Sequence, residues 1–288
     1  MRARLDDLVL GRLAEDGAVP ALTCYDFITA SGVVAAAELF GRGVILLVTP
    51  KTAASRDGLR LTAALRQLAD AAAVPVVVQL DHATDMDLIL RAVEAGADAV
   101  LADGSARSFE ENVAFVTEVG LRTAAHGVVI EAELGGLAGD EDRAFEVEVG
   151  AKTDPAQVAQ FVAASGARLL ATSIGNVHGR YKGTPALDWP LIEAIRAESS
   201  VPLTLHGASG LPESDLARAP QAGLGKVNIN TELRAAILDA TGAQLPRSRA
   251  DGDDVFTLER VWRDAATAFA LSALARLDAT ARPGSDPS

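Results

Sequence analysis

The stretch EAGADAV (94–100) places a glycine between a helix-like segment and an apolar run, and this order recurs along the chain. ASGARLL (164–170) and QAGLGKV (221–227) repeat it. Glycine at such a position readily adopts the left-handed conformation that ends a helix. The apolar run that follows is short and almost uninterrupted, which is typical of a parallel strand buried on both faces. The chain is therefore expected to alternate helices and parallel strands.

The strand-like runs number eight, at residues 18–24, 43–49, 74–81, 97–103, 127–134, 167–173, 201–206 and 225–230. Helix-like segments separate or follow them at residues 28–40, 56–72, 85–95, 109–125, 155–165, 189–198, 213–222 and 231–241. Eight such units within about 250 residues indicate an α/β fold of the (βα)8 TIM-barrel type. An open doubly wound sheet is the alternative, but residues 23–32 lack the glycine-rich phosphate turn that usually follows its first strand.

The two ends of the chain are expected to add helices to this barrel. MRARLDDLVLGRLAEDG (1–17) has helical spacing and lacks the apolar run of a signal peptide. Residues 243–254 are polar and contain a proline, so they are predicted to form a loop. Residues 255–279 are predicted to form a helical extension. We therefore expect one TIM-barrel domain over residues 1–280 and a disordered tail over 281–288.

The composition excludes several classes of protein. The 288 residues carry a formal net charge of −13, which disfavours nucleic acid and anionic membranes as partners. No apolar run reaches the roughly 20 residues of a membrane-spanning helix. Cys24 is the single cysteine, so an intrachain disulfide and a multi-cysteine metal site are both impossible. These features predict a cytoplasmic location.

Three of the four histidines follow predicted strands, at the face where a barrel carries its chemistry. Imidazoles from His82, His178 and His206 can hold one ion and leave a fourth position open, as in a catalytic zinc site. The alternative is three unrelated histidines bonded to backbone groups. Their shared position at the strand ends favours the metal site. His126 falls at a predicted helix end, where a cation stabilises the helix dipole, and is interpreted as structural.

Small residues follow two of these histidines, most clearly in LHGASG (205–210). Uncovered backbone N–H groups in such a loop can bind a phosphate, and Ser209 can add a hydroxyl. Thr231 starts the helix after the last strand, and Lys182 can supply positive charge. Ordinary turns are the alternative explanation for the glycines. Beside a metal ion, these residues together predict a phosphorylated substrate whose carbonyl meets the ion.

Six motifs between about residues 74 and 234 give a more specific indication. They are QLDHATD (79–85), ADGSARSFEEN (102–112), IEAELGGLAGDED (130–142), IGNVHGRYKG (174–183), LHGASG (205–210) and KVNINTELR (226–234). In kind and order they resemble those of the class II, zinc-dependent ketose-bisphosphate aldolases, which cleave fructose or tagatose 1,6-bisphosphate. The resemblance implies a lyase that releases dihydroxyacetone phosphate and an aldehyde from a ketose (bis)phosphate, and a homo-oligomer, either dimer or tetramer.

The resemblance also implies roles for individual residues. The three histidines hold zinc, Asp81 matches the acid that protonates the departing aldehyde oxygen, and Glu141 matches a mobile glutamate that removes a proton from C3 of dihydroxyacetone phosphate. Alternatively, Asp81 orients a zinc ligand and Glu141 is one exposed acid among several. Asp103 and Glu133 match positions near a second metal or monovalent cation, or in the outer shell of the zinc. The matches to the substrate contacts, with the lysine noted above, are Gly179, Lys182, Gly207, Ala208, Ser209, Asn228, Ile229, Asn230 and Thr231.

The chain departs from the family on the side of the aldehyde. Thr23 stands where family members commonly have asparagine, and Asn230 fits neither the fructose-type N-x-D-T nor the tagatose-type N-x-A-T. Residues 250–256 read ADGDDVF and lack the common D-P-R. We therefore expect weak cleavage of fructose 1,6-bisphosphate and a non-standard acceptor aldehyde, including an unphosphorylated one. A non-catalytic descendant that binds metal and phosphate is a further alternative, as is a zinc hydrolase, although residues 23–25 lack the H-x-H pair usual in such hydrolases.

Overall fold

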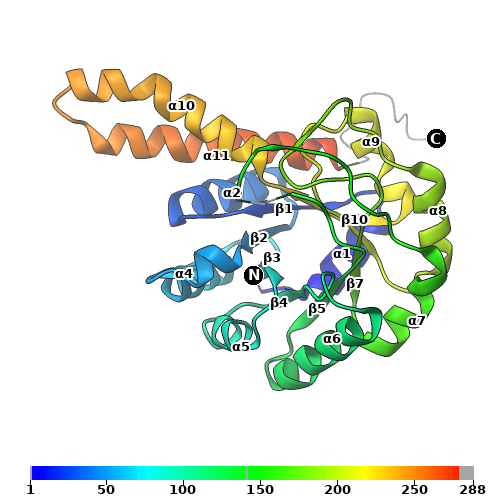
Figure 1. Ribbon diagram of the computed structural model, residues 1–288. Helices are drawn as coiled ribbons and strands as arrows, with labels where there is room; N and C mark the ends of the chain where they lie inside the picture. Colours follow the sequence, from blue (N-terminus) through cyan, green and yellow to red (C-terminus); the bar gives the residue numbers. More distant parts are fainter. Residues whose placement is uncertain (1, 140–141, 279–288) are drawn as a thin grey trace.

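Eight parallel strands pair in a closed ring in the computed structural model, which describes residues 2–139 and 142–278 (Figure 1). The ring closes where β1 pairs with β10, with Val19 opposite Lys226 and Leu22 opposite Ile229. The predicted TIM barrel is therefore confirmed. In the order of the ring, the strands are β1 (Val19–Thr23), β10 (Leu224–Ile229), β9 (Leu203–Leu205), β7 (Leu169–Thr172), β5 (Val129–Leu134), β4 (Ala99–Ala102), β3 (Val76–Ala83) and β2 (Val44–Val48).

Helices cover the outside of the ring, and polar side chains set where several of them begin. Asp26 caps α2 by accepting from the backbone N–H of Thr29 at 2.7 Å. The spacing had predicted that Asp85 lies inside α5, but Asp85 caps this helix. These helices are α2 (Phe27–Phe40), α4 (Gly58–Ala71), α5 (Met86–Glu94), α6 (Phe109–Thr123), α7 (Pro155–Ser165), α8 (Trp189–Glu198) and α9 (Glu213–Arg218), with 3₁₀ turns η1 (Ala124–His126) and η2 (Pro220–Ala222).

Helix α1 (Leu5–Leu13) closes the end of the barrel at which the strands begin. Leu5 and Val9 pack in one cluster with strand residues such as Val19, Ile45 and Leu169, all of them fully buried. Each large apolar side chain buried in this way contributes about 1.5–3 kcal/mol. Because this end is filled with apolar side chains, the polar chemistry of the barrel is confined to the opposite end.

The predicted loop over residues 243–254 is wrong for most of its length. Helix α10 (Thr231–Ala250) runs on through Pro246, and only the residues after Ala250 turn. The proline is tolerated because α10 packs along α11 (Val255–Arg276), which in turn packs against α2 (Figure 1). This packing offsets a cost of about 3 kcal/mol for proline inside a helix. The predicted helical extension is confirmed over α11, and the predicted disordered tail at 281–288 lies outside the described residues.

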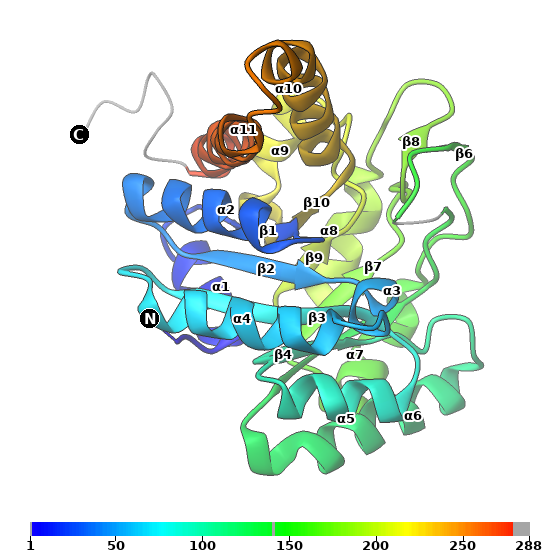
Figure 2. The same cartoon turned by 90° about the vertical axis from the view of Figure 1, so that its left-hand side faces the viewer.

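Two short elements were not predicted. Helix α3 (Pro50–Ala53) follows β2, and a separate two-stranded parallel sheet joins β6 (Glu146–Val147) to β8 (Arg180–Tyr181). Both are too short to show a period in the sequence. Figure 2 shows α3 and this small sheet at the end toward which the strands run. They therefore border the face where the predicted site residues lie.

Candidate metal centre and active site

The end of β3 is distorted at Asp81 and His82. The pairing of β3 with β4 changes register between Leu80 and Ala83, and His82 adopts a left-handed φ of 42°. A bulge of this kind redirects a side chain, and the left-handed backbone costs roughly 1–2 kcal/mol. The result is that His82 faces the other two histidines while Asp81 is fully buried between strands.

The structure brings His82, His178 and His206 together from three different strand ends. The ring centroid of His82 lies 4.7 Å from each of the other two, and those two are 5.9 Å apart. One ring nitrogen from each lies within 4.8 Å of the other two. Burial, reinforced by the neighbouring imidazoles, lowers the pKa of His178 and His206. Both are therefore neutral at pH 7, which is the form that binds a metal.

Two carboxylates lie beside His82. Its Nδ1 is 2.9 Å from Asp103 Oδ2 and 3.5 Å from Glu133 Oε2, and these three residues form a second group able to hold an ion. Burial and then the charge of Asp103 raise the pKa of Glu133 to about 8. Burial opposes ionisation of Asp103, but hydrogen bonds from His82 and Ser105 outweigh it and keep the pKa of Asp103 below its ordinary value. Asp103 is thus the ionised partner of His82.

His206 is held by residues that the sequence analysis did not select. Its Nε2 lies 3.1 Å from Glu131 Oε1, and Glu131 Oε2 accepts from Lys226 Nζ and Gln79 Nε2, both at 2.7 Å. Burial disfavours the carboxylate, but Lys226 and His206 outweigh it and lower the pKa of Glu131. A lysine inside the predicted strand GKVNIN (225–230) was the available signal, because a buried lysine needs an acidic partner.

The residues fit a zinc ion by the chemistry of their donors. Three imidazoles are a typical protein ligand set for catalytic zinc. His206 Nδ1 is buried and has no hydrogen-bond partner among the residues that the structure describes. A buried polar atom without a partner is costly, and a bound cation would satisfy it. His126 lies apart from this group, exposed on η1.

Asp81 directly precedes His82 in the chain, and one of its two carboxylate oxygens has a hydrogen-bond partner. Asn228 Nδ2 donates to Asp81 Oδ2 at 3.1 Å, whereas Oδ1 is buried with no hydrogen-bond partner within residues 2–139 and 142–278. The other predicted catalytic residue, Glu141, lies outside the described residues. Its neighbour Asp142 accepts a hydrogen bond from Tyr25 Oη at 2.8 Å.

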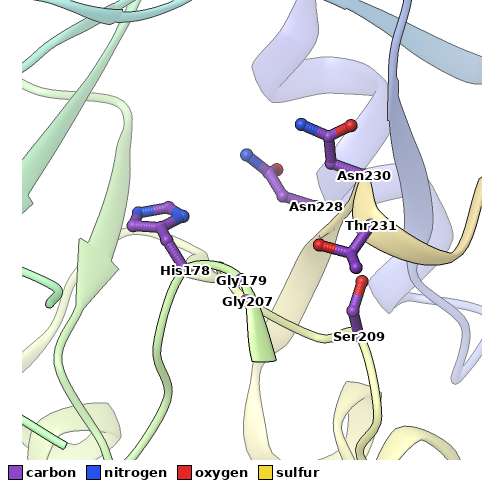
Figure 3. A pocket seen from close by; sticks show the side chains of 7 residues that line it. All are labelled: His178, Gly179, Gly207, Ser209, Asn228, Asn230 and Thr231. Carbon is purple, nitrogen blue, oxygen red and sulfur yellow. The ribbon is translucent and has the colours of Figure 1, made fainter. Parts of the chain in front are cut away.

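A small cavity next to the histidines contains most of the predicted phosphate contacts (Figure 3). Figure 3 shows the hydroxyls of Ser209 and Thr231 across from the ring of His178. Gly207 has a φ of 60°, and a Cβ there would lie 1.9 Å from the carbonyl oxygen of Val177. Only glycine therefore fits at this point of the wall. The cavity is lined by His178, Gly179, Gly207, Ser209, Asn228, Asn230 and Thr231.

Three predicted substrate contacts do not line this cavity. Ala208 and Ile229 are buried behind it. Lys182 follows β8, and its Nζ forms an ion pair with Glu148 Oε1 at 2.7 Å, with 62% of its side chain exposed. The structure therefore places the charge of Lys182 in the small sheet and not in the cavity.

Two further cavities continue the site on the other side of the histidines. One, of about 400 Å³, includes His82, His178, Lys51 and Asp142 in its wall. The next, of about 500 Å³, is lined by Tyr25, Lys51, Thr52, Ser55, Asp142 and Arg234. His178 borders both the small cavity and the cavity of about 400 Å³. Lys51 and Asp142 border both the cavity of about 400 Å³ and the cavity of about 500 Å³. The three cavities therefore form a series, and the histidines lie between its two ends.

Comparison with known proteins gives consistent results. The model of the family described as fructose-bisphosphate aldolase class-II matches residues 5–280. The D-tagatose-1,6-bisphosphate aldolase subunit GatY of Klebsiella oxytoca is 41% identical over 227 residues, covering 77% of this chain and 79% of the relative. The crystal structure of the YdjI aldolase from Escherichia coli K12 superposes with a TM-score of 0.86 at 30% identity, covering 98% of this chain and 100% of that one.

A second solved structure has the same fold. It is a putative fructose-1,6-biphosphate aldolase from Coccidioides immitis, with a TM-score of 0.86 at 27% identity, covering 96% of this chain and 98% of that one. Among the described residues, no helix combines the length and the apolar character needed to cross a bilayer.

Proposed function

This chain belongs to the class II fructose-bisphosphate aldolase family, and we propose that it uses a zinc ion held by His82, His178 and His206 to cleave a ketose bisphosphate into dihydroxyacetone phosphate and an aldehyde. Family membership makes it a lyase, and the alternatives of a zinc hydrolase and of a non-catalytic descendant are disfavoured on the same ground. The observation that carries the proposal is the convergence of three imidazoles, two of them buried, between the ends of one series of cavities.

The donor half of the substrate is assigned to the small cavity. Backbone N–H groups around Gly179 and Gly207, the hydroxyl of Ser209 and the first turn of α10 at Thr231 suit a phosphate group. A phosphate bound there would place the neighbouring carbonyl beside the histidines. The zinc ion would supply a Lewis acid that polarises this carbonyl and stabilises the negative charge left by cleavage.

The proton transfers are assigned to two acids. In cleavage, Asp81, with one buried oxygen available, would act as the base that takes the proton from the C4 hydroxyl. In condensation it would act as the predicted acid and return that proton to the aldehyde oxygen. Glu141 would exchange the proton at C3 of dihydroxyacetone phosphate. Asp103 and Glu133 would hold His82 or a second cation from the side away from the donor cavity.

The last cavity of the series, of about 500 Å³, is assigned to the second phosphate of the substrate. Lys51 and Arg234 both border the last cavity, and no carboxylate of residues 2–139 and 142–278 forms an ion pair with Lys51. These cations can take the place of the arginine missing from the D-P-R position, on a protein whose net charge is −13. We therefore prefer a bisphosphate to the unphosphorylated acceptor. Which ketose is preferred depends on contacts at Asn230 and Tyr25.

Metal analysis combined with two variants tests the proposal. Purified protein should carry about one zinc ion per chain, and His206→Ala should lose it while His126→Ala keeps it. Glu141→Gln should abolish solvent exchange of the C3 proton of dihydroxyacetone phosphate while the metal remains bound. Retention of zinc by His206→Ala, or cleavage of neither fructose nor tagatose 1,6-bisphosphate by the zinc-loaded protein, would refute it.

We further propose that the chain acts as a homo-oligomer in the cytoplasm. The description of its relative from Klebsiella oxytoca as a subunit supports association with another chain. Light scattering at micromolar concentration should give a mass at least twice the 29.8 kDa of one chain.

A further inference from the structure

A chain of buried polar groups lies beneath His206, inside the barrel. Lys226 Nζ is 2.7 Å from Glu131 Oε2, and Glu131 Oε1 is 3.1 Å from His206 Nε2. Gln79 Nε2 donates to Glu131 Oε2 at 2.7 Å. All four residues have no exposed surface. They come from β10, β5, β3 and the end of β9, so four strands must be in register for the chain to form.

Stability of the fold does not explain this arrangement. Removing two charges from water costs several kcal/mol for each ion, and apolar residues of similar size often give an equal or more stable protein. Near α1, the inside of the barrel is filled with apolar side chains, and Val19, Ile45 and Val77 belong to one cluster there. Lys226 lies opposite Val19 and Glu131 lies opposite Leu169, both members of this apolar cluster, so a buried lysine and glutamate at these positions point to a role at the metal centre.

The hydrogen bonds determine which nitrogen of His206 carries the proton. Glu131 accepts from Lys226 and Gln79, both at 2.7 Å, and a carboxylate held by such donors acts as an acceptor, so the proton between Glu131 and His206 is assigned to Nε2. Lys226 and Gln79 are both donors to Oε2, which leaves Oε1 facing the imidazole. Nδ1 then keeps its lone pair, and it has no hydrogen-bond partner among the described residues. Lysine contributes here without touching the histidine itself.

The backbone of His206 is fixed as well. Asn176 Nδ2 donates to the carbonyl oxygen of His206 at 3.0 Å, and Asn176 Oδ1 accepts from the backbone N–H of Ile174 at 2.8 Å. Rotation of the ring away from the other two histidines would break its contact with Glu131, and the hydrogen bond from Asn176 fixes the main chain from which the ring extends. The ligand is therefore held in place before any metal arrives.

We propose that Lys226 and Glu131 are positioning residues that hold His206 as its Nε2-protonated tautomer and so preset Nδ1 as a metal ligand. This inference rests on the proposed function, because it concerns the ion assigned to the three histidines. A metal-bound histidine that donates its second N–H to a carboxylate is a general arrangement, and loss of such a partner typically costs 10–100-fold in metal affinity. Here the partner's own orientation depends on a lysine.

Zinc affinity in two conservative variants tests the inference. Glu131→Gln keeps the shape of the side chain, but its amide can donate to Nε2 and so favours the other tautomer, in which Nδ1 is protonated. Lys226→Met keeps the length of the side chain and removes the donor. Competition with a chromophoric chelator should show a loss of about 10–100-fold in zinc affinity for each. The ¹⁵N shifts of His206 in metal-free protein should show the proton on Nε2 in the wild type.

Asp98→Asn is the matched control. Asp98 is also a buried carboxylate of the barrel, paired with Arg66 and Arg2, and it lies nearer the α1 end, away from the histidines. Its substitution should lower the melting temperature and leave zinc affinity unchanged. Zinc affinities within twofold of the wild type in both test variants, or a wild-type proton on Nδ1, would overturn the inference.

The same measurements separate this inference from the function on which it rests. If the wild type binds zinc, His206→Ala abolishes binding and both test variants bind normally, the inference fails and the metal site remains. If the wild type binds no zinc, both the inference and the proposed function fail. Should a test variant not fold, the ¹⁵N spectrum of the wild type still decides the tautomer.

Discussion

Replacing Gly207 by alanine should disable the donor side of the site while leaving the barrel folded. The added Cβ would lie 1.9 Å from the carbonyl oxygen of Val177 and 2.7 Å from its carbonyl carbon. Ordinary contacts of this kind are near 3.4 Å, so the backbone must move by more than 1 Å. Either the peptide between Val177 and His178 moves, or the loop around Gly207 moves, whose backbone N–H groups are assigned to the phosphate. A misplacement of about 1 Å in an active site can cost roughly 100-fold in rate.

Gly210→Ala is a control that matches the conformational cost. Gly210 also has a left-handed backbone, with a φ of 84°, but nothing lies within 4 Å of an added Cβ. Both variants therefore carry the penalty of about 1–2 kcal/mol for a side chain in this conformation, and only Gly207→Ala adds the collision. Both melting temperatures should be lowered, and that of Gly207→Ala by more, because it alone adds the collision.

Steady-state cleavage of a ketose bisphosphate and proton exchange with dihydroxyacetone phosphate would measure the difference. Gly207→Ala should lose about 100-fold or more in kcat/KM in both assays, whereas Gly210→Ala should stay within about threefold of the wild type. Equal losses in the two variants would show that the close approach to Val177 is irrelevant, and the assignment of the donor cavity would have to be abandoned.

Three further predictions concern other parts of the molecule. Asp81→Asn should lower the cleavage rate by about 100-fold or more and leave C3 proton exchange, followed by NMR in deuterium oxide, much less affected; equal losses in both would contradict its separate role. Lys51→Met should raise KM for a ketose bisphosphate by about tenfold or more, since a hydrogen bond to a charged group contributes about 1.5–3 kcal/mol, and an unchanged KM would exclude Lys51 from substrate binding. Leu5→Ala should lower the free energy of unfolding in urea by about 2–5 kcal/mol with unchanged zinc affinity, and a changed affinity would mean that α1 is coupled to the metal centre.

The barrel could be predicted because its signals are local. Glycine after a helix and a short apolar run can each be recognised within a few residues; the apolar run recurs with every unit of the fold, and the glycine with several of them. The continuation of α10 through Pro246 could not be predicted in this way. It depends on packing against α11, which is a contact between two segments and leaves no mark at the proline itself.

In the candidate site, too, residues with a local sequence signal could be predicted, and those that depend on contacts between distant segments could not. His82, His178 and His206 were identifiable because each lies at or shortly after the end of a strand, and all parallel strands end at the same face. The pairing of Lys226 with Glu131, 95 residues apart, depends on the register of strands that are not neighbours in the chain. Lys182 was given a role in binding because its charge suited a phosphate, but the direction of a side chain beside a loop is not encoded by its type, and it pairs with Glu148.

The apolar plug formed by α1 determines how the metal centre exchanges with its surroundings. With Leu5 and Val9 filling one end of the barrel, ions, substrate and chelators must share the mouth at the other end. A ligand that fills the cavities there would stand between the metal and the solvent. Removal of the metal is then limited by ligand departure, so a saturating ketose bisphosphate or its analogue should slow the rate at which a chelator strips the protein, even where the equilibrium affinity for zinc is the same.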